Sequence, residues 1–173
     1  MRESAILVPH SGRSGSLNLI RETMKRIILV TLLIMATMPL WGQRLSRGEK
    51  MPDYQVKAWI STSQPSGGKA TMVEFFHSGN KVSVNRLAAL EQLAKDNSRT
   101  LNVVVVTRED TPEVRKMLGG RAFYSAVDDD GKTFSAFSAL YVPYGVLADK
   151  KGRVVWLGNP VSLKTEDIPQ LIQ

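Results

Sequence analysis

Met72-Val-Glu-Phe-Phe-His-Ser-Gly-Asn-Lys-Val-Ser83 is the most informative stretch of this 173-residue chain, because an apolar segment in it leads directly into the start of a helix. The run 71–76 is short, mostly apolar and suited to a strand in the middle of a sheet. Beyond it, Leu87, Leu90 and Leu93 recur at helical spacing between about residues 82 and 95. The stretch therefore predicts a buried strand, a short loop and a helix with one apolar face.

A second buried strand follows that helix. Leu101–Thr107 contains four consecutive valines, a continuous apolar run typical of a strand that is covered on both faces. Because a helix separates the two strands, we expect them to run parallel. Thr111 as a cap, Pro112 in the first helical position and Gly119 at the end predict a second helix.

The rest of the chain alternates short strand and helix patterns with turn residues. We expect an edge strand at 54–60, a strand at 123–127, a turn at 128–131 and a short helix at 133–140. Strands at 144–148 and 153–157 form a hairpin, and a helix at 166–172, capped by Thr165, closes the chain. Residues 43–173 are thus expected to form one α/β domain, with a central mixed sheet flanked by helices.

This order of elements resembles the thioredoxin superfamily, and most of all its exported branch of cytochrome c maturation thioredoxins and peroxiredoxin-like proteins. Val73–Phe76 with Leu87–Leu93 is similar to the family's strand, active loop and long helix, and 123–140 falls where the branch inserts a strand and a helix. Tyr141-Val-Pro143-Tyr-Gly-Val-Leu-Ala-Asp149-Lys-Lys-Gly resembles a "gly-val-pro-thr … asp-lys-asp-gly" stretch, and Val155–Pro160 resembles the hairpin ending of some members. The resemblance covers residues 50–173 and implies a thioredoxin-like fold.

The active loop departs from that family. Its Cys-x-x-Cys positions read Asn80-Lys81-Val82-Ser83, and the chain contains no cysteine. A thiolate is the nucleophile of disulfide exchange, and neither an amide nor a hydroxyl replaces it. We therefore expect no thiol-disulfide oxidoreductase activity.

The first 42 residues have the pattern of an export signal. Lys25 and Arg26 precede the apolar run 27–40, and small-residue processing is possible before Gln43. The run is shorter than the ~20 residues of a spanning helix, so we predict a cleaved signal peptide at 24–42, with an uncleaved anchor as the open alternative. Residues 1–23 are predicted to be an over-extended start or a disordered tail. The product is expected to be soluble and either periplasmic or extracellular, without stable insertion in the membrane.

The charge of the chain is mildly basic and dispersed. The whole chain has 23 Lys and Arg against 16 Asp and Glu, and residues 44–173 hold 18 and 14 of these. No basic stripe or run is present, so the composition does not indicate nucleic-acid binding.

The resemblance implies that Pro143 is a cis-proline beside the active loop, which leaves the backbone of Val142 free to pair with an extended peptide. The simpler reading is a turn-forming proline. Asn80 is expected to cap the long helix, with Ser83 serving the same turn. The alternative is a small anion site at the helix start, with Lys81 adding charge.

Three further groups are candidates for chemistry. His77 is the only histidine of the predicted mature chain, which makes a poor metal site, and a pair with Ser78 or Ser83 has no obvious orienting acid. Glu74 resembles the buried acid beneath the family's cysteines, so we expect a raised pKa. With no thiol to serve, it is either a relic or a partner of Lys57 or of a loop amide. The Asp128–Gly131 segment lacks the pattern of a calcium loop and is expected to be a turn.

Together these features favour a redox-inactive binding module that holds a protein or peptide of the cell envelope in the cleft beside Pro143. Its expected binding residues are His77, Ser78, Asn80, Lys81, Ser83, Val142 and Pro143. No cofactor, metal or nucleic acid is expected. A non-redox enzyme built on His77, Ser78 and Lys81 is the alternative, and an accessory subunit that docks through its helix faces is a third possibility.

Overall fold

The computed structural model describes residues 21–28 and 44–172. The chain divides into two compact units, Met1–Gln43 and Arg44–Gln173. In the first unit, residues 21–28 are helical. The predicted segments 1–23 and 24–42, with the processing site before Gln43, lie for the most part outside the described residues. Among the residues that are described, no helix is both long and apolar enough to cross a membrane.

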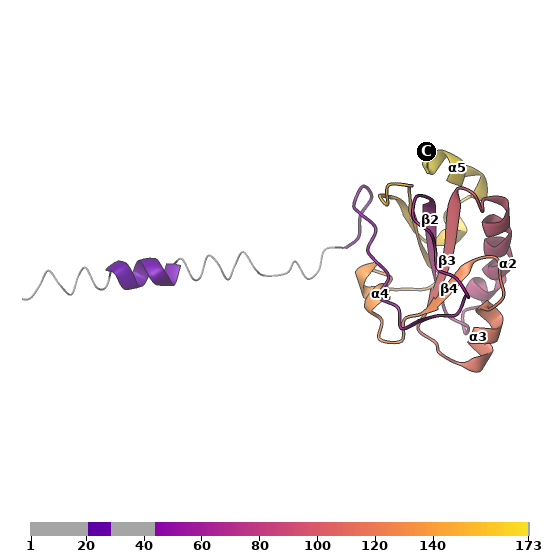
Figure 1. Cartoon of the computed structure of the whole chain (residues 1–173), viewed down its shortest axis with the longest axis horizontal. Coiled ribbons are helices and arrows are strands. Elements are labelled where there is room, and N and C mark those ends of the chain that lie inside the picture. The colour runs from indigo at the N-terminus through magenta and orange to yellow at the C-terminus, as the bar shows by residue number, and fades with distance from the viewer. Residues whose placement is uncertain (1–20, 29–43, 173) are drawn as a thin grey trace, which may run out of the picture. The chain divides into compact units, whose positions relative to one another are not determined.

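The second unit is built on a six-stranded mixed sheet with the strand order β1-β4-β3-β2-β5-β6 (Figure 1). The strands are β1 (Ala58–Trp59), β2 (Ala70–Phe76), β3 (Leu101–Thr107), β4 (Tyr124–Val127), β5 (Tyr144–Ala148) and β6 (Val154–Gly158). β2, β3 and β4 are parallel, whereas β1, β5 and β6 each pair antiparallel with their neighbours. The parallel pairing expected for the two apolar runs is confirmed.

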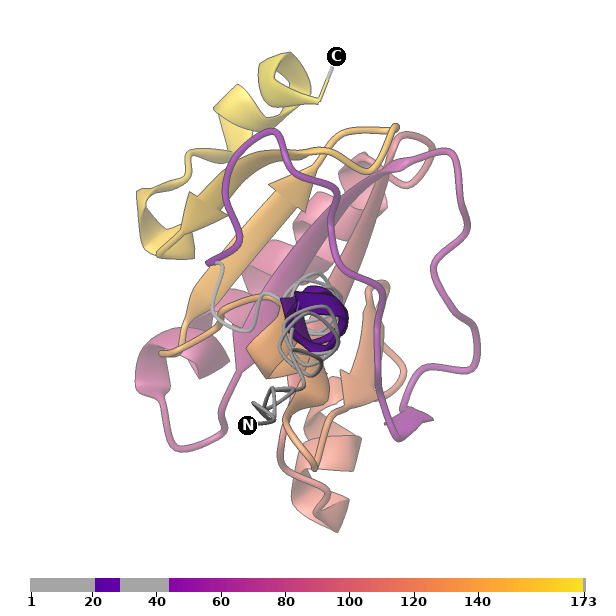
Figure 2. The same cartoon turned by 90° about the vertical axis from the view of Figure 1, so that its left-hand side faces the viewer.

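Helices cover both faces of this sheet. They are α2 (Lys81–Asp96), α3 (Pro112–Leu118), α4 (Lys132–Ala136), α5 (Ile168–Leu171) and the short 3-10 turns η1 (Pro160–Ser162) and η2 (Thr165–Asp167). α2 and α3 lie behind the sheet in Figure 2, and α4 lies in front of it. The expected α/β sandwich of a thioredoxin-like domain is therefore present.

Each face of the sheet carries its own apolar core. Along β2, Met72 and Phe76 pack with the leucines of α2, while Val73 and Phe75 pack with Phe137 on the α4 side. This alternation is the period-2 pattern of a strand that is buried on both faces. β2 is fully buried along its length, so it fixes the position of the loop that follows it.

Most predicted boundaries hold to within a few residues, because capping residues mark them. Thr111 Oγ1 accepts a hydrogen bond from Val114 N at 3.3 Å, and Pro112 begins α3. The turn between β5 and β6 closes through Asp149, whose N–H donates to Arg153 O and whose carbonyl accepts from Gly152 N. The Asp128–Gly131 turn is also present, with Asp128 Oδ2 accepting from Phe134 N at 2.8 Å.

Three predicted elements are wrong in extent. The helix expected over 133–140 ends at Ala136, with Phe137 as its C-cap. The edge strand expected over 54–60 is reduced to Ala58–Trp59, because Gln55 N bonds to the hydroxyl of Thr133 instead of to a strand. The last helix begins later than expected, at Ile168, after the η2 turn. No side-chain cap forms at that turn, so the proposed capping role of Thr165 is not seen.

Candidate functional site

The candidate site lies where β2 ends, α2 begins and β5 begins. β5 runs antiparallel to β2, so Tyr144 at its start lies opposite Phe75 near the end of β2. The Val142–Pro143 peptide bond just before β5 is cis, as the resemblance implies, and it is placed beside the loop 77–80. Residues 62 positions apart in the sequence, Asn80 and Val142, therefore meet at one edge of the sheet.

Asn80 joins the two sides of this site. Its Oδ1 accepts hydrogen bonds from Val82 N at 3.0 Å and Ser83 N at 3.1 Å, which is the expected N-cap of α2. Its Nδ2 donates to Val142 O at 3.0 Å. Two amides of the first helical turn, those of Val82 and Ser83, are thus already satisfied by a side chain of the protein, which disfavours the alternative of an anion site with Lys81.

The backbone of Val142 has only one of its two polar groups in a hydrogen bond. Its carbonyl accepts from Asn80, whereas its N–H has no acceptor in the described part of the chain. A backbone donor without a partner at a surface is a group that an incoming extended chain can satisfy. The site therefore offers one free donor to a peptide.

The other two loop positions differ sharply in exposure. Lys81 is exposed at the start of α2. Ser83 is 1% exposed, and its hydroxyl has no hydrogen-bond partner among the described residues. Ser83 thus lies beneath the helix start, where a bound partner cannot touch it, and it does not add a cap through its side chain.

Ser78 is held by an acid that the sequence analysis missed. Its N–H and its hydroxyl donate to the two carboxylate oxygens of Glu109, each at 2.6 Å. Glu109 follows the end of β3, and the ends of adjacent parallel strands meet at one edge of a sheet. The place of Glu109 just after the predicted strand 101–107 was the sequence signal for its role in this site.

His77 is not arranged as a base for Ser78. Its Nδ1 accepts a hydrogen bond from Gly79 N at 3.0 Å and lies 3.9 Å from Glu109. The Ser78 hydroxyl donates its proton to Glu109 instead of to the ring. The Ser78–His77 pair considered for an enzyme is therefore not formed in this geometry, and the group that accepts the Ser78 proton is the Glu109 carboxylate.

Glu74 is buried beneath the start of α2, and its partner is Arg86. Arg86 Nε and Nη2 donate to the two carboxylate oxygens at 2.8 and 2.9 Å. The expected bond to Lys57 is wrong, because Lys57 pairs with Asp129 at 2.7 Å on the surface. Burial raises the pKa of Glu74, as expected, and the hydrogen bonds and charge of Arg86 oppose that rise. Arg86 falls within the buried stripe between Ser83 and Leu90, which was the sequence signal for an inward-facing cation.

Large apolar side chains are exposed on segments that form or adjoin the site. Large hydrophobic residues exposed in the unit 44–173 are Val82 (46%), Leu140 (76%), Tyr141 (52%) and Val161 (59%). Val82 is in the first turn of α2, Leu140 and Tyr141 precede Val142, and Val161 follows Pro160, which lies against Gly145 in β5. We call these four residues the apolar rim.

Within residues 21–28 and 44–172, no group of three His, Cys, Asp or Glu side chains could hold a metal ion. A lone histidine with no second strong ligand is a poor site for the metals that favour nitrogen.

Comparison with known proteins gives the fold. No protein-family model matches the chain, and no curated protein matches it. Several solved structures do. A Chlorobium tepidum protein described as a thiol:disulfide interchange protein, DsbE, is 21% identical over 74% of this chain and 96% of its own, with a TM-score of 0.60. A thiol-disulfide isomerase from Corynebacterium glutamicum is 22% identical over 70% and 92%, with a TM-score of 0.54.

A third similar structure is an exposed lipoprotein thioredoxin from Streptococcus pneumoniae, 19% identical over 61% of this chain and 84% of its own, with a TM-score of 0.52. These neighbours are named for thiol chemistry, for which this chain has no cysteine. Sequence identities this low support a shared fold and do not support a shared activity. The protein is therefore thioredoxin-like in fold, and it has no cysteine.

Proposed function

We propose that this protein is a non-redox binding module, exported to the cell envelope, that holds an extended segment of another protein at the Val142 edge. The observation that carries the proposal is the free N–H of Val142 beside the exposed side chains of Leu140 and Tyr141. Backbone pairing supplies general affinity in such a mode, and neighbouring side chains supply preference.

The apolar rim supports this reading. Soluble monomers rarely gather large exposed apolar side chains around one surface unless a partner covers them. Because the rim is apolar, the partner segment we expect is rich in aliphatic or aromatic residues. The cation of Lys81 lies at the same helix start, and no ion pair neutralises it in the described part of the chain.

The export part of the proposal rests on the sequence pattern of residues 24–42. The neighbouring structure described as an exposed lipoprotein shows that this fold occurs outside the cytoplasm in another organism. In this chain no cysteine is available for a lipid anchor, so an exported product would not be lipidated in that way.

A phage-displayed library of random 12-residue peptides, selected on the purified full chain, tests the proposal. We expect enrichment of apolar sequences, and we expect the selected peptide to bind at least tenfold more weakly when Leu140→Ser and Tyr141→Ser are combined, since burying one such side chain contributes about 1.5–3 kcal/mol. Lys116→Ala, an exposed change on α3, is the matched control. Equal affinity for wild type and the double variant, or no enrichment at all, would reject the cleft and favour docking through the helix faces.

A further inference from the structure

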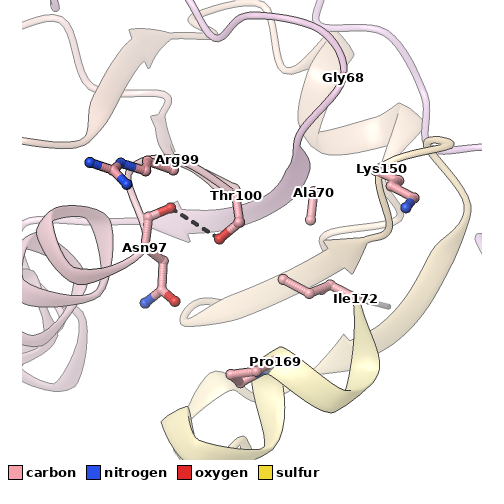
Figure 3. Close-up of a pocket in the computed structure, with 8 residues that line it drawn as sticks. All are labelled: Gly68, Ala70, Asn97, Arg99, Thr100, Lys150, Pro169 and Ile172. Carbon is pink, nitrogen blue, oxygen red and sulfur yellow. Dashed lines mark hydrogen bonds between the residues drawn. The ribbon is translucent and has the colours of Figure 1, made fainter.

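A cavity lies at the end of α2 that is remote from the candidate site. It has a volume of about 310 Å³ and is lined by Gly68, Ala70, Asn97, Arg99, Thr100, Lys150, Pro169 and Ile172 (Figure 3). α2 has 16 residues, so the helix separates this cavity from the Asn80 loop by about 24 Å. No part of the proposed peptide-binding function involves it.

The wall of the cavity is fixed by main-chain bonds. Ala70 N donates to Thr100 O at 3.0 Å, which joins the start of β2 to the turn after α2. Asn97 N and its Nδ2 both donate to Leu93 O, each at 3.1 Å, and so hold the C-terminus of α2. A preformed wall of this kind lowers the entropy that a ligand must overcome on binding.

The lining combines an apolar middle with positive edges. Ala70, Pro169 and Ile172 supply apolar contacts, and Figure 3 shows Arg99 and Lys150 on opposite sides of them. The eight lining residues include no carboxylate, and neither cation is in an ion pair within the described residues. In Figure 3 the guanidinium of Arg99 is directed away from the middle of the cavity, but the side chain is exposed and has no partner to lose when it turns inward.

Polar groups between these edges add hydrogen-bonding capacity. The hydroxyl of Thr100 donates to Asn97 O at 3.4 Å, a long bond that leaves the oxygen able to accept or to be redirected. Asn97 Oδ1 has no donor in the described part of the chain. The cavity thus pairs a small set of polar groups with an apolar surface, as ligand sites do.

We infer that this cavity binds a small organic carboxylate with a hydrocarbon body. The hydrocarbon lies against Ala70, Pro169 and Ile172, and the carboxylate is met by Arg99 or Lys150. The volume is at the lower end of the roughly 300–1,000 Å³ found for small-molecule sites, so the ligand has to be compact. Two positive edges without an acid favour an anion over a cation or a neutral molecule.

Titration of the ¹⁵N-labelled full chain with hexanoate tests this inference. We expect saturable shifts of the backbone amides of Ala70, Thr100 and Ile172. Acetate, which lacks the body, and hexylammonium, which has the opposite charge, should give no saturable shift of these amides. Arg99→Gln and Lys150→Gln should each weaken hexanoate binding by about two- to fivefold, the range of an exposed ion pair, and the double variant more.

Lys151→Gln is the matched control, because Lys151 lies in the same hairpin turn and does not line the cavity. It should leave hexanoate binding unchanged. Equal binding of hexanoate and hexylammonium, equal binding by wild type and the double variant, or shifts that rise linearly without saturation would each overturn the inference. None of these outcomes bears on peptide binding at Val142, which is measured separately.

Discussion

Glu74 and Arg86 show how a single buried pair can stabilise a fold without contributing to chemistry. Glu74 is 2% exposed and Arg86 has 22% of its side chain exposed, so removal of the arginine leaves a carboxyl buried without a partner. Breaking such a pair costs about 3–5 kcal/mol, whereas replacing both members by apolar residues is often neutral. The effect of the pair on the free energy of unfolding therefore depends on both side chains together and cannot be assigned to either residue alone.

We expect Arg86→Met to lower the free energy of unfolding by about 3 kcal/mol at neutral pH, and Glu74→Met with Arg86→Met to restore most of it. Urea unfolding of the two single variants and the double variant gives the coupling energy directly. Additive losses in the double variant would show that the two side chains do not depend on each other.

The same pair predicts a pH dependence. Burial raises the pKa of Glu74 in the folded state, so folding favours its protonated form. Its contribution to stability is present below the unfolded pKa and is lost as pH rises through the folded pKa. Without the opposing Arg86 the folded pKa rises further, so the deficit of Arg86→Met should shrink as pH falls. A deficit that stays constant from pH 8 to pH 5 would contradict this origin.

Asn80 has two separable roles. Replacement by serine keeps a good N-cap but removes the bond to Val142 O, whereas alanine removes both. We expect Asn80→Ala to lower the free energy of unfolding by about 1 kcal/mol more than Asn80→Ser does, measured by urea unfolding. If the two variants are equally stable, the cap contributes nothing measurable.

At the scale of the elements, the junction between β2 and α2 is the place where the resemblance to thioredoxins predicts a dithiol loop. Two cysteines three residues apart at a helix start meet the distance requirement for a disulfide. We expect Asn80→Cys combined with Ser83→Cys to form a reducible intramolecular bridge, seen by mass spectrometry after alkylation with and without reductant. Asn80→Cys with Lys116→Cys is the control that should not bridge within the chain. Two thiols that stay free in the first variant under oxidising conditions would mean that these positions do not correspond to the thiol positions.

The loop 77–80 depends on β3 as well as on β2. The Glu109 carboxylate accepts hydrogen bonds from both the N–H and the hydroxyl of Ser78, so it holds this loop to the end of β3. We expect Glu109→Ala to cost about 1–3 kcal/mol and to speed hydrogen exchange at the Ser78 amide, while Ser78→Ala, which keeps the main-chain bond, costs less. Unchanged exchange at Ser78 in the Glu109 variant would show that the loop is held by other contacts.

For the molecule as a whole, the sequence predicted the architecture better than the site. The continuous valine run of β3 and the helical spacing of the leucines of α2 are strong signals, so both elements were predicted almost to the residue. The N-cap role of Asn80 also followed from its position. The roles of Glu109 and Arg86 did not, because a position at a strand end or on a buried helix face indicates an inward side chain but does not identify the partner that packing between elements brings to it. The predicted length of β1 was wrong for the same reason, because Gln55 N bonds to the hydroxyl of Thr133 instead of pairing with a strand.

The hydrogen bonds of the Asn80 side chain to both α2 and Val142 also affect the stability of this part of the fold. In a dithiol protein the helix start has to tolerate a reactive sulfur, and active positions of that kind are commonly less stable than the best alternative residue. Here Asn80 caps α2 and joins it to the segment before β5, so it adds to the stability of the fold. A variant with cysteines at positions 80 and 83 would gain two thiols and would lose this stabilising contact. A redox-active variant of this loop is therefore expected to start from a less stable fold than the one it replaces.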